Sequence, residues 1–131
     1  MSAIQELRKH AKELEDATGL SVQLTEEGNR IFVVLVKAPL PPGVFRLDAT
    51  DVLFVTDQQY PLSAMDMFWA EVEVIRLDGS IPQGADATEQ YLGRTWRRFS
   101  WHRGGVWNPG GNPVLDHFSF VESRWALEAA R

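Results

Sequence analysis

The stretch RIFVVLV, residues 30–36, decides what kind of fold this chain can form. Every residue after Arg30 in this stretch is apolar, so the run lacks the polar alternation of a strand with one solvated face. A short, continuous apolar run bounded by turn signals is typical of a strand that is covered on both faces. We therefore expect a central strand here, with other elements packed on either side of it.

The residues around this run predict an antiparallel meander. Val22–Leu24 is strand-like, and the Glu-Glu-Gly-Asn sequence at residues 26–29 is a hairpin signal that joins it to the central strand. A proline-rich break at residues 38–43 ends the central strand, because proline cannot donate to a strand ladder. Asp51–Val55 and Met67–Ile75 then give a third and a fourth strand.

A helix is predicted at each end of the chain. Ser2 and Gln5 have the spacing of a capping box, and apolar residues recur at helical intervals through a helix from Ile4 to Asp16. Asn112 is a suitable N-cap for a second helix, from Pro113 to Ala129, because proline is favoured at the first helical position.

Between the fourth strand and the second helix, residues 77–111 show no sustained periodicity, and a connection of this length is often functional. The expected order is therefore an N-terminal helix, a four-stranded antiparallel meander, a long irregular segment and a C-terminal helix. Helices placed against an antiparallel sheet define the α+β class. We find no repeat or linker, and we expect residues 1–131 to form one domain.

The composition excludes several classes of function. A content of 44% hydrophobic and 24% charged residues is that of a globular protein, and no apolar run is long enough for a membrane span. The N-terminus lacks the apolar core of a secretory signal, so we expect a cytoplasmic protein. A net charge of −5 disfavours nucleic acid and anionic membranes as partners. The absence of cysteine excludes disulfides, thiolate metal sites and a thiol nucleophile.

Arginine and aromatic residues are concentrated in RTWRRFSWHRGGVWNPGG, residues 94–111. Rings that alternate with cations can stack bases and hold phosphates, but they can also anchor a loop to its own core. The acidic net charge favours anchoring, and we expect both Trp107 and Trp125 to be largely buried. The residues of this stretch that could form a binding surface are Arg94, Trp96, Arg97, Arg98, Trp101, His102 and Arg103.

The histidines give one candidate for chemistry. His10 lies among charged residues in the first helix and is expected to be solvated. His102, His117 and Asp116 have no spacing typical of a metal site, so no metal and no other cofactor are expected. His102 lies in a polar loop, where it could act as an acid, a base or a nucleophile, although a hydrogen bond that orders the loop is the favoured role.

Four stretches carry a resemblance to a known family. YPLSAMDMFW at residues 60–69 is similar to the YP turn and following strand of ubiquitin-conjugating enzymes, and VWNPGGNPVLDHF at 106–118 to their W-x-P motif and helix. With LDGSIPQ and LGRTWRRFSWH, the chain more closely resembles a bacterial branch of this ubiquitin-conjugating-enzyme-like (UBC-like) superfamily, prokaryotic family E, from about Val22 to Trp125. The motif residues are Tyr60, Pro61, Asp66, Trp107 and Pro109.

The resemblance implies a UBC-like fold but not the usual chemistry. Conjugating enzymes carry ubiquitin as a thioester on a cysteine, which would fall near Ala85, or between Phe99 and His102, in this sequence. This chain has no cysteine and no HPN triplet, so it matches a branch without the catalytic cysteine and cannot perform thioester transfer.

The expected function is therefore that of a binding protein, not an enzyme. The resemblance implies a bacterial pathway with a ubiquitin-like protein, an activating-enzyme homologue and a JAB-type isopeptidase. We expect the chain to bind the ubiquitin-like protein, the activating-enzyme homologue, or both. Two alternatives stay open: a non-thiol transferase that uses His102, and a nucleic-acid-binding protein that uses the arginines and tryptophans of residues 94–103.

Overall fold

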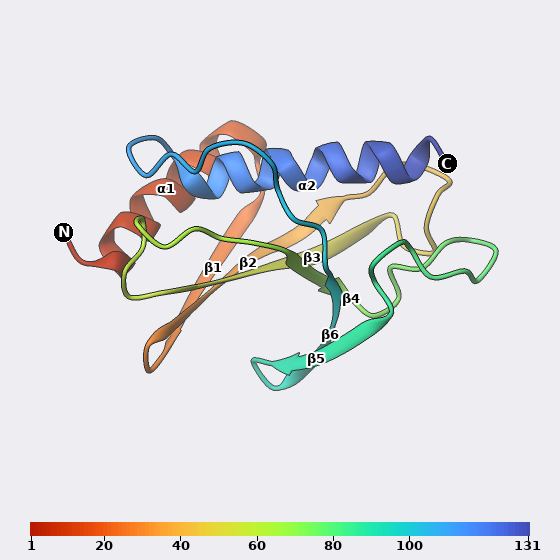
Figure 1. The fold of residues 1–131 in the computed structure, drawn as a ribbon, viewed down its shortest axis with the longest axis horizontal. Coiled ribbons are helices and arrows are strands. Elements are labelled where there is room, and N and C mark those ends of the chain that lie inside the picture. Colours follow the sequence, from red (N-terminus) through yellow and green to blue (C-terminus); the bar gives the residue numbers. More distant parts are fainter.

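The computed structural model covers residues 1–131 and shows two helices on one face of a six-stranded antiparallel sheet (Figure 1). The strand order is β1-β2-β3-β4-β6-β5, and the first four strands follow one another as a meander. The predicted α+β class is confirmed. The elements are α1 (Ala3–Thr18), β1 (Ser21–Glu27), β2 (Arg30–Pro39), β3 (Ala49–Asp57), β4 (Phe68–Glu71), β5 (Ala87–Tyr91), β6 (Arg94–Phe99) and α2 (Pro113–Ala129).

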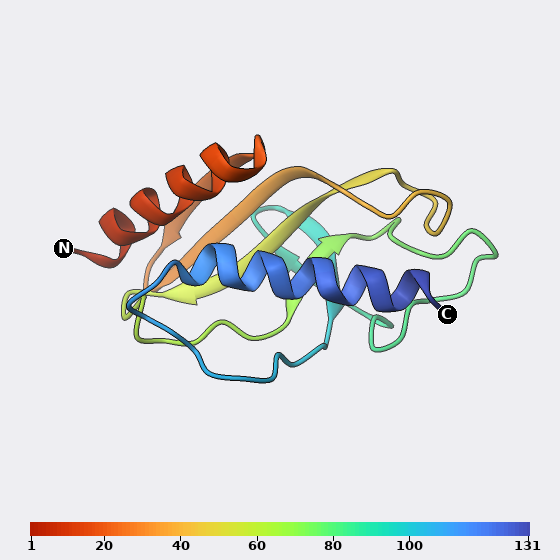
Figure 2. The same ribbon diagram turned by 90° about the horizontal axis from the view of Figure 1, so that it is seen from above.

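Both helices begin where their caps predict. The Ser2 hydroxyl accepts a hydrogen bond from the backbone N–H of Gln5, and the Gln5 side chain accepts one from the backbone N–H of Ser2. The Asn112 side chain accepts a hydrogen bond from the backbone N–H of Leu115, with Pro113 at the first helical position. Neither helix has the length and apolar content that crossing a membrane requires. Viewed from above, both helices lie over the sheet (Figure 2).

Strand β2 is covered on both faces, as its sequence predicts. Ile31, Val33 and Leu35 belong to the main core, which the helices share, whereas Phe32 and Val34 point to a second, smaller core on the other face. The sheet curls over this second face, because the β5–β6 hairpin returns toward β2. The side chains that form the smaller core are Phe32, Val34, Leu53, Trp69 and Trp96.

The predicted four-stranded meander is confirmed as β1 to β4, but the segment expected to be irregular contains two further strands. Residues 87–99 form a β5–β6 hairpin, and β6 pairs with β4, which makes the sheet six-stranded. The two turn residues, Leu92 and Gly93, both have positive φ, 55° and 71°, as a tight hairpin turn requires. Leucine rarely adopts this conformation, so the turn has no recognisable sequence signal.

Strand β4 is also shorter than the predicted Met67–Ile75. It ends at Glu71, where the chain turns and the backbone N–H of Val74 donates to the Glu71 carbonyl. A run of alternating residues therefore divides into a short strand and a turn. The apolar residues after the turn still reach the interior, since Val74 is buried in the main core.

His10 is buried, which contradicts the expectation that it is solvated. Its Nδ1 lies 2.6 Å from the Tyr60 hydroxyl, and its side chain lies between α1 and the turn that contains Tyr60 and Pro61. Burial lowers the pKa of His10, while neighbouring acidic residues such as Glu6 oppose this effect. The charged residues nearest to His10 in sequence, Lys9 and Lys12, are exposed, so they give no sign of its burial.

Candidate functional site

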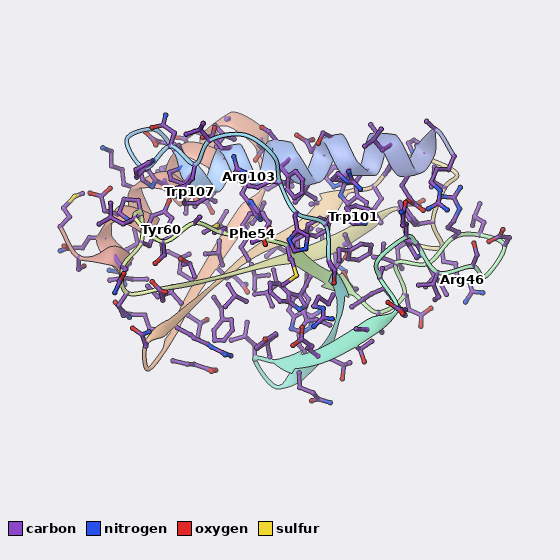
Figure 3. The ribbon with its side chains drawn as sticks, viewed as in Figure 1. Arg46, Phe54, Tyr60, Trp101, Arg103 and Trp107 are labelled. Atoms are coloured by element: carbon purple, nitrogen blue, oxygen red, sulfur yellow. The ribbon has the colours of Figure 1, made fainter.

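The candidate site lies where the loop of residues 100–112 passes the turn that precedes β4. The indole N–H of Trp107 donates to the Pro61 carbonyl at 2.7 Å, which joins the two segments. The adjacent concavity has a volume of about 290 Å³, and we call it the loop hollow. Figure 3 shows Trp107 close to Tyr60 and beside Arg103. The residues that line the loop hollow are Ala64, Met65, Asp66, His102, Arg103, Gly105 and Trp107.

The motif residues of the two segments come together in this region. Tyr60 is buried beside His10 and does not line the loop hollow, while Trp107 lines it and is held by its bond to Pro61. Pro109 is exposed in the turn that follows and does not line the loop hollow. Burial raises the pKa of the Tyr60 hydroxyl, so this group is neutral and serves as a hydrogen-bonding partner.

His102 and Asp66 form a pair at the edge of the loop hollow. His102 Nδ1 lies 2.7 Å from Asp66 Oδ2, and the side chains are 69% and 52% exposed. A neutral ring that donates from Nδ1 to the carboxylate keeps the Nε2 lone pair free, which is the arrangement of a general base. No serine, threonine or cysteine lines the loop hollow, so no side-chain nucleophile of that kind lies beside this base.

Arg103 lies deeper in the loop hollow and has no carboxylate in ion-pair distance. Its Nη1 is 3.4 Å from His117 Nδ1, and its guanidinium carbon is 5.3 Å from the Trp107 ring centroid. The His117 Nε2 is 2.7 Å from the Met67 carbonyl, so Nε2 donates and Nδ1 is left to accept from Arg103. Arg103 is thus supported by a ring nitrogen and an indole face, neither of which cancels its charge.

His117 is itself uncharged in this arrangement. It is fully buried, and burial lowers its pKa to about 4. The Met67 carbonyl and the Asp66 carboxylate act in the opposite direction, and the Arg103 charge lowers the pKa further. The sequence suggests a metal ligand as the one role for His117, and the His, Asp and Glu side chains of the structure form no group of three or more that could hold a metal ion.

Two of the expected binding arginines are paired within the fold. Arg94 forms an ion pair with Asp51 at 3.0 Å, and Arg98 forms one with Glu89 at 3.4 Å. The Nε of Arg98 also donates to the Ser100 hydroxyl at 3.1 Å. Both arginines lie on β6, their carboxylate partners lie on β3 and β5, and neither arginine lines the loop hollow.

Three further residues of that set are part of the interior. Arg97 donates to the carbonyls of Val72 and Ala85, at 3.0 and 2.7 Å, and so connects two turns. Trp96 and Trp101 are 0% and 5% exposed, so their rings are not available to a partner in this fold. Ala85 itself is buried, whereas His102 is at the surface. Of the two places where the resemblance puts the missing cysteine, only the second is therefore accessible.

The two tryptophans expected to be buried differ. Trp125 is buried in the main core, as predicted, whereas Trp107 is only half-buried against it. The loop that carries Trp107 meets the core on one side only, and its indole is held by the bond to Pro61. The pairing of Asp66 with His102 joins residues 36 positions apart, and no local sequence pattern reveals it.

Comparison with known families agrees with this architecture. A family model described as Prokaryotic E2 family E matches residues 7–130, which is nearly the whole chain. The chain belongs to prokaryotic E2 family E. The α+β arrangement of this prokaryotic E2 family E protein agrees with a UBC-like fold, and the loop hollow lies entirely within the matched residues. No match was found among curated proteins or among solved structures.

Proposed function

We propose that this prokaryotic E2 family E protein binds a ubiquitin-like protein, or the homologue of its activating enzyme, without forming a thioester. The observation that carries the proposal is a family match over residues 7–130 in a chain that contains no cysteine. A thioester requires a thiolate, so a protein of this family without sulfur nucleophiles retains its binding surfaces but not that chemistry.

The rim of the loop hollow is where we place the partner. Leu62 and Val106 are 74% and 88% exposed. Leu62 directly follows Pro61 and Val106 directly precedes Trp107, and these two residues are joined by the hydrogen bond. Exposed apolar side chains beside a concavity are suited to contact with another protein, where their burial contributes to affinity. The two side chains belong to segments far apart in sequence, so the folded chain is needed to present them together.

Calorimetry tests the proposal. The chain should bind at least one ubiquitin-like protein or activating-enzyme homologue encoded beside its gene, and the double variant Leu62→Asp/Val106→Asp should weaken binding about tenfold or more. Leu77→Asp is the matched control, because Leu77 is exposed and residues 77–86 lie at the opposite end of the molecule from residues 103–111 (Figures 1 and 2).

Two outcomes would count against the proposal. Absence of any partner at high micromolar concentration would remove its support. Equal weakening by the control and by the double variant would show that the partner does not contact the rim of the loop hollow, and the surface assignment would then be wrong.

The alternative of a non-thiol transferase gains one specific observation, the 2.7 Å contact between His102 and Asp66. A base oriented by a carboxylate is catalytically competent, and an imidazole can also accept an acyl group. However, His102 is 69% exposed, so water has access to any acyl-imidazole formed there and would hydrolyse it. We therefore favour binding without covalent transfer.

Rapid-quench intact-mass spectrometry separates these alternatives. The wild-type chain and His102→Ala would be mixed with a ubiquitin-like protein, its activating enzyme and ATP. We expect no covalent adduct on either chain. An adduct on the wild type that disappears in His102→Ala would identify an enzyme and would overturn the noncovalent proposal.

A further inference from the structure

The guanidinium of Arg103 has donors that the fold does not use. Its one hydrogen bond is the 3.4 Å contact with His117 Nδ1, and its other neighbour is the Trp107 ring. A guanidinium has more N–H donors than this single contact uses, and they are arranged in a planar fork that fits a carboxylate. Arg103 is half-buried and lines the loop hollow, so these donors are available to a ligand that enters there.

The charges in the loop hollow allow an anion to pair with Arg103. His117 is neutral because its pKa is lowered to about 4, so it neither cancels nor reinforces the Arg103 charge at neutral pH. Asp66 lines the same concavity, but its carboxylate already accepts from His102. A carboxylate can form two parallel hydrogen bonds with the Arg103 guanidinium and is repelled by Asp66, whereas a phosphate dianion doubles both this attraction and this repulsion, so charge alone does not separate the two.

The remaining lining fits the rest of a peptide. Met65 and Trp107 supply apolar surface beside Arg103, and Gly105 presents backbone without a side chain. Gly105 has φ of 86°, which favours glycine, and the space where a Cβ would lie is open. A concavity of about 290 Å³ is at the small end of ligand sites and can hold one end or one side chain of a peptide, but not a folded element.

We propose that the loop hollow is a binding site for a peptide carboxylate, which Arg103 pairs with in a bidentate manner. Two sources supply this chemistry, the free C-terminus of a chain and an acidic side chain within one. The inference rests on the proposed function only for the identity of the protein that carries the carboxylate. The carboxylate site itself is formed by this chain alone, so it can be tested without a protein partner.

Titration of the full chain with small probes tests the site, followed through the amide signals of Gly104 and Gly105 and the indole N–H signal of Trp107. N-acetyl-dialanine carries a C-terminal carboxylate, its amide carries none, and the α-amide of N-acetyl-aspartate carries only a side-chain carboxylate. We expect saturable shifts with at least one carboxylate probe. The uncharged amide should bind at least about tenfold more weakly than that probe. The carboxylate probe that binds more tightly shows whether the site takes a C-terminal carboxylate or a side-chain carboxylate.

Matched variants assign the effect to Arg103. Arg103→Gln should weaken the carboxylate probe about tenfold or more, since a charged hydrogen bond is lost. Arg94→Gln makes the same change of charge at an arginine that is already paired with Asp51, and it should leave the affinity unchanged. Arg103→Lys keeps the charge without the planar fork, so its affinity for the carboxylate probe should be intermediate. An unshifted Trp107 indole signal in this variant shows that the loop is intact.

Several results would overturn the site. These are the absence of shifts at probe concentrations on the order of 10 mM, equal binding of the amide, phosphate binding as tightly as the carboxylate, or equal losses in the Arg103→Gln and Arg94→Gln variants. The proposed function is judged separately. If the probes fail while a protein partner binds, only the carboxylate site is wrong, and if the probes bind while no protein partner does, only the proposed function loses its support.

Discussion

Strand β6 and the loop that follows it, residues 100–112, are both rich in arginine and tryptophan, yet they hold these residues in different ways. In β6, Trp96 is fully buried, and Arg94 stacks on its ring at 4.2 Å while pairing with Asp51. In the loop, Trp107 is half-buried, and Arg103 lies near its ring at 5.3 Å with no carboxylate partner. The same two residue types therefore form a closed arrangement in one region and an open one in the other.

The clustering of charge in a sequence therefore does not show which charges lack a partner in the fold. The partners of the β6 arginines come from other strands and turns, such as Asp51 and the Val72 carbonyl. The sheet and the turn after β4 place these acceptors beside β6, whereas no carboxylate lies within ion-pair distance of Arg103 in the loop. A ligand can therefore satisfy Arg103, whereas in β6 it would have to displace existing partners.

The largest difference between the two regions is expected in the contribution of their tryptophans to stability. Trp96→Ala removes a fully buried indole and should lower the free energy of unfolding by about 3–5 kcal/mol. Trp107→Ala removes a half-buried ring and its bond to Pro61, and should cost only about 1–2 kcal/mol. Urea denaturation of both variants measures these values. Equal losses would show that the loop is anchored as firmly as the strand.

The second-largest effect on the free energy of unfolding is expected from acidification. It should act through His117, which contacts Arg103 of the loop. The pKa of His117 is about 4 in the folded protein and near 6.5 when unfolded, so between these values the unfolded chain binds more protons. The free energy of unfolding should therefore fall as the pH drops from 6.5 toward 4, by about 3 kcal/mol in total for this group. His10, whose pKa is also lowered, adds to the loss in the same direction.

Urea denaturation across this pH range measures the slope, and His117→Gln provides the control. A glutamine does not titrate, so the variant should lose the part of the slope that His117 supplies. Protonated His117 would also repel Arg103, so the Trp107 indole signal should shift with the same midpoint while that of Trp96 does not. An unchanged slope in His117→Gln would show that other groups cause the acid sensitivity.

A smaller effect is expected from the arginines themselves. Arg97→Met leaves the carbonyls of Val72 and Ala85 without their donor and should cost about 1–3 kcal/mol of the free energy of unfolding. Arg103→Met removes a guanidinium with one long hydrogen bond and should change stability by less than about 0.5 kcal/mol. Thermal and urea denaturation test both. A costly Arg103→Met would mean that Arg103 supports the fold and is not free for a ligand.

The parts of the fold that depend on local signals could be predicted from the sequence. The caps at Ser2 and Asn112 fixed the starts of both helices, and the apolar run in β2 indicated a strand covered on both faces. The β5–β6 hairpin could not be predicted, because its turn begins with Leu92 at positive φ. In β5 burial alternates, but the half-buried positions include Glu89, so the polarity of the sequence does not follow it, and in β6 burial does not alternate.

The candidate site was predicted only in part, for a different reason. The family resemblance pointed to Asp66 and Trp107, and the loop composition pointed to His102 and Arg103, but nothing local relates these residues to one another. Asp66 lies beside His102 because the start of β4 pairs with the end of β6. This pairing brings the turn before β4 next to the loop after β6. Which arginines are paired likewise depends on strand neighbours, and the sequence alone does not specify those.

The smallest effect is expected for single-stranded nucleic acid, the alternative ligand of residues 94–103. Arg94 and Arg98 are already neutralised by Asp51 and Glu89, so phosphate contacts would have to break these pairs and would release few counterions. The double variant Arg94→Gln/Arg98→Gln should therefore change the affinity for a labelled oligothymidine by less than about threefold. The logarithm of the binding constant should fall with the logarithm of the salt concentration with a slope of about one or less. Anisotropy titrations at about 50 and 200 mM salt measure both quantities. Tight binding near physiological salt that is lost in Arg97→Glu/Arg98→Glu would reverse the comparison, because β6 would then be the open, ligand-binding region and the loop its support.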